Sequence, residues 1–133
     1  MKITVDTNVV LRYLLNDDKD QAAIARKTMQ DAALVAIPLS VLCEVVWTLS
    51  RGYKMASDTI AGALEALTEA NSVAVNRSAV ETGLVMLRAG GDFADGVIAN
   101  EGLALGGETF VTFDKKAAAI LKKHRRMQTR LLS

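Results

Sequence analysis

Short apolar, β-prone runs alternate with longer segments of helical periodicity along this chain of 133 residues. The strands are expected at 2–5, 34–37, 73–75 and 109–113, with a last edge strand at Leu131 and Leu132. Each earlier run is followed by one or more segments with helical spacing of apolar residues. Strands that alternate with helices predict an α/β fold with a mostly parallel sheet covered by helices on both faces.

Local capping signals place several of the helix ends. Ser40 is expected to cap a buried helix at 41–51, and Gly52 suits the left-handed position that closes it. Ser78 and Glu81 have the S-x-x-E spacing of a capping box, which would open the following helix. These signals define the boundaries of the helices that cover the predicted sheet.

Length and composition favour one domain, 1–133, because the chain is long enough to bury a core and contains no evident linker. The single cysteine, Cys43, excludes an internal disulfide and a cysteine-rich zinc site. The N-terminus lacks the order of a secretion signal, and charged residues interrupt every apolar run that approaches membrane-spanning length. We therefore expect a cytoplasmic protein that is not inserted in a membrane.

Positive charge gathers at the C-terminal end, although the net charge is only +1. From Asp114 onward a single acid is accompanied by seven basic residues: Lys115, Lys116, Lys122, Lys123, Arg125, Arg126 and Arg130. A basic segment beside an acidic body is compatible with binding to a polyanion such as RNA. A solvated helix face explains the same charges equally well.

Four acidic residues stand where apolar runs end or helical patterns begin, namely Asp6, Glu44, Asp95 and Asp114. In an open α/β sheet the crevice lies beyond the carboxyl ends of the strands, so carboxylates far apart in sequence can converge there. Mg²⁺ and Mn²⁺ prefer such oxygen ligands, and a metal that keeps bound water can activate it against a phosphodiester. The four residues therefore predict a metal site.

Each carboxylate also has a simpler explanation. Asp6 could only cap the first helix. Glu44 stands in an apolar helix, where an acid is costly unless it binds something, and an ion pair with Arg12 would satisfy it. Asp92 and Asp95 are three residues apart at a helix start, so one can cap while the other binds; we favour Asp95 as the ligand.

Polar neighbours could support these ligands. Asn8 follows Asp6 closely enough to orient its carboxylate, and Thr112 lies two residues before Asp114 on the same face of the strand. Arg51, Lys54 and the lysines after Asp114 could hold phosphates, or could be ordinary surface charges.

Three further side chains are interpreted as structural. His124 has no serine or cysteine partner at a recognisable spacing, so a nucleophilic triad is not supported, and we interpret it as a surface residue. Cys43 and Trp47 are interpreted as residues of the core or of a dimer interface.

The sequence resembles the PIN-domain ribonucleases over nearly its whole length. The resemblance rests on VDTNVV at the N-terminus, SVLCEVVW around Glu44, DFADGVIA around Asp95 and TFVTFD ending at Asp114, in that order. Within that family the chain is most similar to the VapC-type toxins of type II toxin–antitoxin pairs.

The resemblance implies a PIN-like three-layer α/β/α fold and a metal-dependent endoribonuclease. It implies that Asp6, Glu44, Asp95 and Asp114 are the metal ligands and catalytic acids, with Asn8, Asp92 and Thr112 in support. The implied cofactor is Mg²⁺ or Mn²⁺. The implied partners are an RNA substrate, a second copy of the chain in a homodimer, and a small antitoxin protein that forms a hetero-oligomer with the toxin.

Two other functions remain open from the residues. A phosphatase that uses Asp6 as an aspartyl nucleophile would need a second Asp two residues later, and position 8 is Asn. A noncatalytic interaction module would be expected to have lost an acid from the set, and all four are present.

Overall fold

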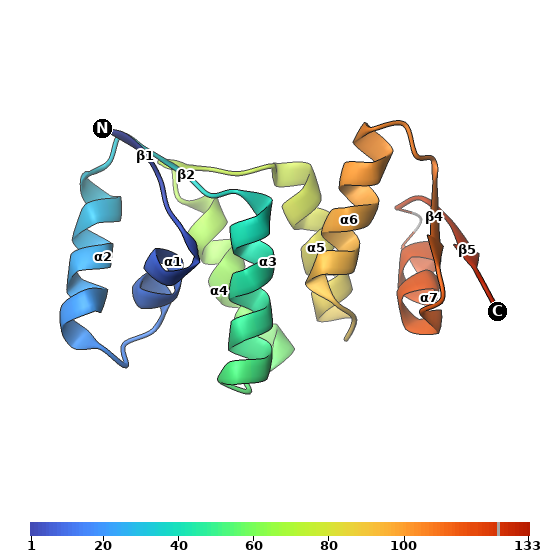
Figure 1. Cartoon of the computed structure of the whole chain (residues 1–133), viewed down its shortest axis with the longest axis horizontal. Coiled ribbons are helices and arrows are strands. Elements are labelled where there is room, and N and C mark those ends of the chain that lie inside the picture. The colour runs from blue at the N-terminus through green and yellow to red at the C-terminus, as the bar shows by residue number, and fades with distance from the viewer. Residues whose placement is uncertain (125) are drawn as a thin grey trace. The chain divides into compact units, whose positions relative to one another are not determined.

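The computed structural model describes residues 1–124 and 126–133 of the chain. It divides into two compact units, Met1–Val75 and Asn76–Ser133, which we call the N-terminal and C-terminal units. Figure 1 labels most of the elements of both. No helix in the described part is long and apolar enough to cross a membrane.

The N-terminal unit is built on a three-stranded parallel sheet. Its strands are β1 (Lys2–Thr4), β2 (Leu34–Ala36) and β3 (Val73–Ala74), in the order β1-β2-β3. Ile3 pairs with Val35 in one ladder and Val35 with Val73 in the other, and Val35 is fully buried. The connections between these strands are helical, as parallel pairing requires.

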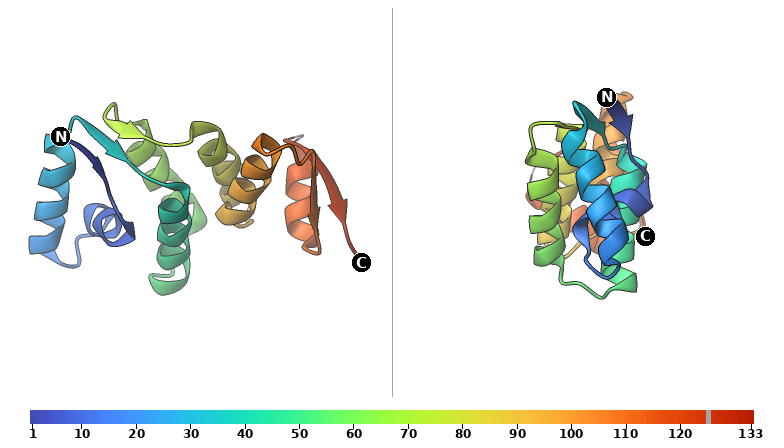
Figure 2. Two further views of the ribbon diagram at one scale, coloured as in Figure 1. Left: turned by 45° about the horizontal axis from the view of Figure 1, so that its top comes forward. Right: turned by 90° about the vertical axis from the view of Figure 1, so that its left-hand side faces the viewer.

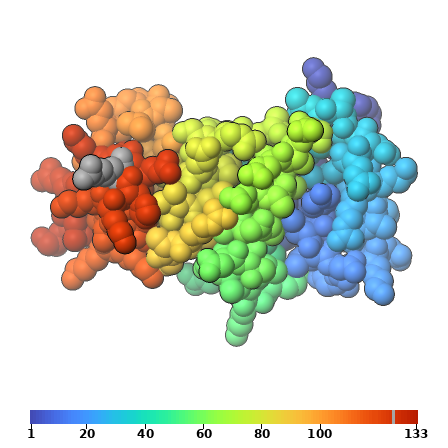
Figure 3. Space-filling model, turned by 180° about the vertical axis from the view of Figure 1, so that it is seen from behind, coloured from blue at the N-terminus to red at the C-terminus, as the bar shows by residue number. Residues whose placement is uncertain are grey.

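The helices of this unit are α1 (Thr7–Leu14), α2 (Lys19–Asp31), α3 (Leu39–Trp47) and α4 (Ser57–Glu69), and a π-helical segment, η1 (Thr48–Gly52), continues α3. Helix α1 packs against α2 and α3, and α4 packs against β3 and η1. Figure 3 shows α4, in green, running across the surface on the far side from Figure 1. Their buried faces are aliphatic, so the core here consists mainly of Val, Leu, Ile and Ala side chains.

The C-terminal unit contains α5 (Arg77–Arg88), α6 (Phe93–Ala104), β4 (Thr109–Thr112), α7 (Lys115–Lys123) and β5 (Gln128–Leu131). Strands β4 and β5 form a parallel pair, with Phe110 opposite Thr129, and α7 packs on this pair (Figure 2, left). The core cluster of this unit consists of Met86, Ala99, Ala117, Ile120 and Leu121.

The predicted α/β class with parallel strands is confirmed, because every strand pair in the described residues is parallel. Several capping predictions were wrong. Helix α3 begins at Leu39 after Pro38, not after a Ser40 cap, and Asn76 caps α5 by accepting from the amide of Ala79 at 3.2 Å, which leaves Ser78 inside the helix.

The predicted left-handed Gly52 was also wrong. Lys54 has that conformation, with φ of 52°, and the glycines with positive φ in the described residues are Gly90 and Gly106. Those two do close α5 and α6, where the glycine pairs predicted breaks. The terminal strand is longer than expected, since β5 starts at Gln128 and pairs with β4 along its length.

Candidate functional site

Three of the acidic residues singled out in the sequence lie near one another in the C-terminal unit. Asp92 caps α6, Asp95 stands in the first turn of that helix, and Asp114 caps α7 directly after β4. The carboxylate of Asp92 accepts from the amide of Ala94 at 3.0 Å, and that of Asp114 accepts from Ala117 at 3.0 Å. Two helix starts therefore hold a group of negative charges at the end of a parallel strand.

Asp95 is the carboxylate that this arrangement disturbs most. Partial burial raises the pKa of Asp95, and the negative charges of Asp92 and Asp114 raise it further. Each cause disfavours the ionised form, so a bound cation would relieve both the loss of solvent and the repulsion. A raised pKa is typical of a carboxylate that binds a cation when the cation is absent. Carboxylates clustered for a structural reason show the same rise in pKa.

Close packing of α5 on α6 fixes the start of α6. A Cβ at Gly96 would lie 2.6 Å from the carbonyl oxygen of Thr82 and 2.8 Å from Cα of Gly83. A Cβ at Gly83 would lie 2.6 Å from the ring of Phe93. Only glycine fits at these two places without displacing a neighbour, so α6 approaches α5 to near contact beside Asp95.

A hydrogen-bonded pair that the sequence did not reveal also joins these helices. The amide nitrogen of Asn100 on α6 donates to the hydroxyl of Ser78 on α5 at 2.8 Å. The signal in the sequence was the capping-box pattern, which assigned Ser78 a different partner. The bond holds the side of α6 two turns beyond Asp92.

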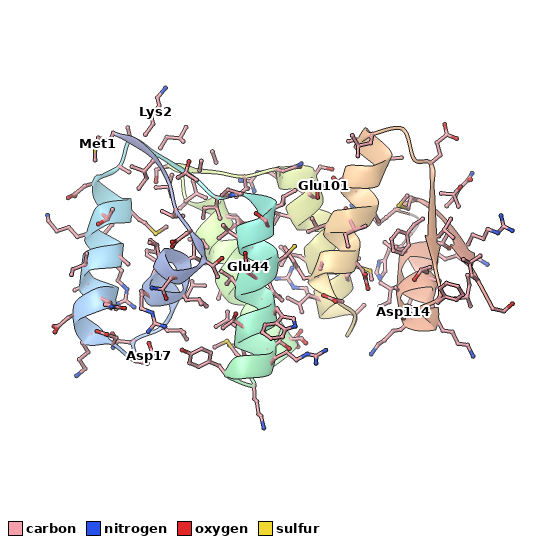
Figure 4. All side chains as sticks on the ribbon, viewed as in Figure 1. Met1, Lys2, Asp17, Glu44, Glu101 and Asp114 are labelled. Carbon is pink, nitrogen blue, oxygen red and sulfur yellow. The ribbon has the colours of Figure 1, made fainter. Side chains whose placement is uncertain are left out.

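Thr112 supports the turn that carries Asp114, as its position suggested. The Thr112 hydroxyl accepts a hydrogen bond from the backbone amide of Asp114 at 2.9 Å. The bond closes a local turn between β4 and α7, and it fixes the backbone from which the Asp114 carboxylate extends. Figure 4 labels Asp114 at the start of α7.

In the N-terminal unit Asp6 caps α1, as one of its two interpretations expected. Its carboxylate accepts from the amide of Val9 at 3.0 Å, and its side chain is exposed directly after β1. One oxygen makes this bond, which leaves the other lone pairs of the carboxylate to face solvent or a ligand. Asn8 is exposed on the first turn of the same helix.

Glu44 lies on α3 with its side chain exposed (Figure 4), not among the apolar side chains as the sequence suggested. The buried face of α3 is formed by Val41, Leu42, Val45 and Val46. Arg12, the partner that the simpler explanation gave to Glu44, binds Asp17 instead, at 2.7 Å. The cost of a buried acid therefore does not apply to Glu44.

Trp47 is also exposed, on the same helix as Glu44, with 63 % of its surface accessible. This exposure contradicts the interpretation of Trp47 as a core residue, while its assignment to a dimer interface stays a prediction. The apolar composition of α3 did not reveal which side of the helix is buried. Arg51, Lys54, Lys115 and Lys116 are exposed as well, and His124 lies at the surface as predicted. Arg125, one of the basic residues counted in the sequence, lies outside the described residues.

Comparison with protein families gives a match to the PIN domain over residues 3–123. The match covers most of the chain and includes all four predicted ligands. The chain belongs to the PIN domain family. Comparison with curated proteins gave no match.

Membership confirms the PIN-like three-layer α/β/α fold that the resemblance implied, and PIN domains are generally nucleases that hydrolyse phosphodiesters. PIN nucleases typically use divalent metal ions. The donor chemistry fits such an ion, because the predicted ligands are all carboxylates. Among residues 1–124 and 126–133, however, no group of three or more His, Cys, Asp or Glu side chains is placed to hold a metal ion.

The four predicted ligands of this PIN domain are shared equally between its two units. Asp6 and Glu44 belong to the N-terminal unit, and Asp95 and Asp114 belong to the C-terminal unit. The structure brings Asp92, Asp95 and Asp114 close enough for their charges to interact. The joint action of all four on one metal ion stays a prediction.

Proposed function

We propose that this PIN domain is a metal-dependent endoribonuclease that acts as the toxin of a VapBC-type toxin–antitoxin pair. Family membership supports the hydrolysis of a phosphodiester. The observation that supports metal dependence most directly is the half-buried Asp95, whose charge is opposed by burial and by the neighbouring Asp92 and Asp114. A divalent cation is the partner that would favour ionised carboxylates in this position.

We assign the metal ligands as Asp6, Glu44, Asp95 and Asp114. When bound, Mg²⁺ or Mn²⁺ would activate water for attack on the phosphodiester. Asp92 would stay at the cap of α6 and hold the first turn of that helix, while Thr112 would hold the backbone of Asp114 through the hydrogen bond described above. Asn8, in the first turn of α1, would orient Asp6.

RNA is the substrate that the surface charges favour. The exposed lysines that follow Asp114 are adjacent in sequence to a predicted ligand, and they would neutralise phosphates on either side of the cleaved bond. Binding that depends on such contacts weakens steeply as salt concentration rises. A homodimer and a small antitoxin that blocks the site complete the proposal, in keeping with the resemblance to VapC-type toxins.

The test is cleavage of total cellular RNA by the purified chain, free of any antitoxin, with Mg²⁺ or Mn²⁺ and with EDTA. We expect discrete fragments that require the metal and are lost in Asp6→Asn, Glu44→Gln and Asp95→Asn, with a reduction of at least about 100-fold for loss of a group that acts in the transition state. Glu69→Gln is the matched control, because Glu69 is an exposed acid at the end of α4 and is outside the proposed site.

Metal binding is measured on the same proteins by thermal melting, which does not depend on activity. Mg²⁺ or Mn²⁺ should raise the Tm of the native chain and of Glu69→Gln, and raise that of the three site variants less. Folded protein that gains stability from metal but cleaves no RNA would contradict the nuclease and favour a noncatalytic interaction module.

A further inference from the structure

The exposed side of α3 and η1 carries a row of four side chains: a hydroxyl, an acid, an aromatic ring and a base. Ser40, Glu44, Trp47 and Arg51 are all exposed and follow one another at spacings of four, three and four residues. Within α3 those spacings place Ser40, Glu44 and Trp47 on one side of the helix, and Arg51 follows in the wider π-helical turn of η1. The opposite side is buried through Val41, Leu42, Val45, Val46 and Leu49, so the row faces outward because the apolar side packs inward.

Trp47 is the unusual member of this row. It is the only tryptophan of the chain, and 63 % of its surface is accessible. Leaving an indole ring in water forfeits a large part of the hydrophobic stabilisation that its burial would give. Tryptophan is nevertheless enriched at binding surfaces, because its ring offers a large apolar face and its N–H can donate a hydrogen bond.

Positive charge follows Trp47 closely. Arg51 lies four residues beyond it, in η1, and Lys54 lies just after that segment. Both side chains are exposed. Lys54 has a left-handed backbone with φ of 52°, a conformation that costs a residue with a Cβ on the order of 1 kcal/mol.

The turn that holds Lys54 is tied to the rest of the N-terminal unit. The Tyr53 hydroxyl donates to the Asp17 carboxylate at 2.8 Å, and the same carboxylate binds Arg12. The amide of Met55 donates to the carbonyl of Leu49 at 3.0 Å. An exposed ring and two cations are therefore held on a fixed segment of backbone.

We propose that Trp47 stacks on a base of single-stranded RNA that runs along α3, while Arg51 and Lys54 bind its phosphates. The inference rests on the proposed nuclease function, since it makes this row the part of the substrate site next to Glu44. From Glu44 to Trp47 the α-helix rises about 4.5 Å, and Arg51 lies four residues further along in η1. The groups proposed for stacking and for phosphate binding therefore lie on the segment that directly follows the predicted metal ligand.

The chemistry of the row favours a single strand. Bases in a duplex are already stacked and cannot lie on an exposed ring, whereas unpaired bases stack readily on Trp and Arg side chains. Stacking accepts any base, so the row would add affinity and fix where the strand lies relative to Glu44, and it would contribute little sequence preference.

Because the chain has a single tryptophan, its fluorescence reports on the proposed contact directly. The probes are a 12-residue oligouridylate and a chain of the same length that lacks bases, both mixed with the full chain in EDTA so that no cleavage occurs. We expect the oligouridylate to quench the fluorescence of Trp47 and the abasic chain to leave it nearly unchanged.

Affinity for the two probes is measured by anisotropy of a label on the RNA. Trp47→Ala should weaken binding of oligouridylate roughly 5- to 100-fold and leave binding of the abasic chain unaltered, and Trp47→Phe should retain most of the affinity. Arg51→Ala should lower the affinity for both probes and reduce the salt dependence of binding. The controls are Leu105→Ala, another large exposed apolar residue, and Lys19→Ala, another exposed cation.

Two results would overturn the inference. One is equal binding of oligouridylate by Trp47→Ala and the native chain, without quenching in the latter. The other combines two observations: Trp47→Ala halves the molecular mass measured by light scattering, and the fluorescence of the native chain changes with protein concentration but not with RNA. Together they would assign Trp47 to an interface between copies of the chain.

The nuclease proposal fails separately. If RNA quenches Trp47 and its binding depends on Trp47, but the RNA is never cleaved when metal is present, the stacking inference stands and the nuclease proposal is contradicted. Metal-dependent cleavage by a chain whose fluorescence ignores RNA would preserve the enzyme and contradict the stacking.

Discussion

Folding makes the ionised form of Asp95 less favourable than it is in the unfolded chain. Burial and the charges of Asp92 and Asp114 raise the pKa of its carboxyl, so the folded chain binds a proton at Asp95 more tightly than the unfolded chain does. The stabilising contribution of the protonated group is complete below the unfolded pKa and is lost as pH rises through the folded pKa. At neutral pH the ionised Asp95 therefore lowers the stability of the metal-free protein.

Replacing this charge should stabilise the metal-free protein. Asp95→Asn is expected to raise the Tm at pH 7 by up to about 4 °C, a value limited by the solvent that screens partly exposed charges. In EDTA, the stability of the native chain should fall relative to that of the variant as pH rises through the folded pKa of Asp95. Thermal melts from pH 4 to pH 8 measure both effects.

The matched control is Glu101→Gln, which removes an exposed acid from the same helix and should leave the Tm nearly unchanged. A metal-free Asp95→Asn protein that melts below the native chain at pH 7 would contradict the proposed repulsion.

Tyr53 and Arg12 act on Asp17 in the opposite sense. The Tyr53 hydroxyl bond and the Arg12 guanidinium lower the pKa of the Asp17 carboxyl, so its contribution to stability is present above the unfolded pKa and is lost as pH falls through the folded pKa. Tyr53→Phe removes the larger cause, and we expect the pKa of Asp17 to rise toward its ordinary value. Carboxyl chemical shifts in an NMR titration report that change.

Tyr13→Phe is the control for this titration. Arg26 donates its hydrogen bond to the backbone carbonyl of Tyr13, so loss of the ring hydroxyl leaves that bond in place. An unchanged Asp17 titration in Tyr53→Phe would show that the hydroxyl bond does not hold the carboxylate in solution.

At the scale of elements, α5 and α6 approach one another at Gly83 and Gly96. Gly96→Ala would place a methyl 2.6 Å from a backbone oxygen of α5, so the helices must separate. We expect a loss of roughly 1–3 kcal/mol in the free energy of unfolding, typical of overpacked sites. Urea denaturation followed by circular dichroism measures it.

Gly102→Ala on the same helix is a matched control, because a Cβ at Gly102 meets nothing within 4 Å. That change should stabilise the protein by roughly 0.5–1 kcal/mol through the lower backbone entropy of alanine in a helix. A loss of stability shared equally by both variants would mean that close packing is not the cause.

The ends of helices were predictable where the local sequence contained one strong helix-breaking or capping pattern. The glycine pairs ended α5 and α6, and Asp92, which directly follows the first pair, caps α6. At α5 the sequence analysis placed the cap at Ser78, whereas Asn76 caps the helix two residues earlier. A choice between adjacent caps depends on how the helix packs, which the local sequence does not encode.

The same distinction applies to the site. The strand and helix ends that hold Asp6 and Asp114 were predictable from apolar runs that stop at an acid. The exposure of Glu44 and Trp47 was not, because α3 is apolar on most of its circumference and only packing decides which side is covered. Nor did local sequence indicate the burial of Asp95, which depends on contacts formed on folding.

The sequence predicted one domain over residues 1–133, and the folded chain divides into two compact units of different sizes. The C-terminal unit, residues 76–133, has only a two-stranded sheet. A segment of roughly 60 residues buries too small a fraction of its surface to be more than marginally stable alone, and an isolated pair of strands adds little. We therefore expect the two units to unfold together.

The single tryptophan makes this expectation measurable, since Trp47 reports on the N-terminal unit and circular dichroism reports on all helices. In a cooperative protein the two signals follow one urea transition. Gly96→Ala, a change confined to the C-terminal unit, should then shift the Trp47 transition and the dichroism transition by the same amount. Two separate transitions, with the one reported by Trp47 unmoved by Gly96→Ala, would contradict a single domain, because destabilisation of one unit would then leave the folding equilibrium of the other unchanged.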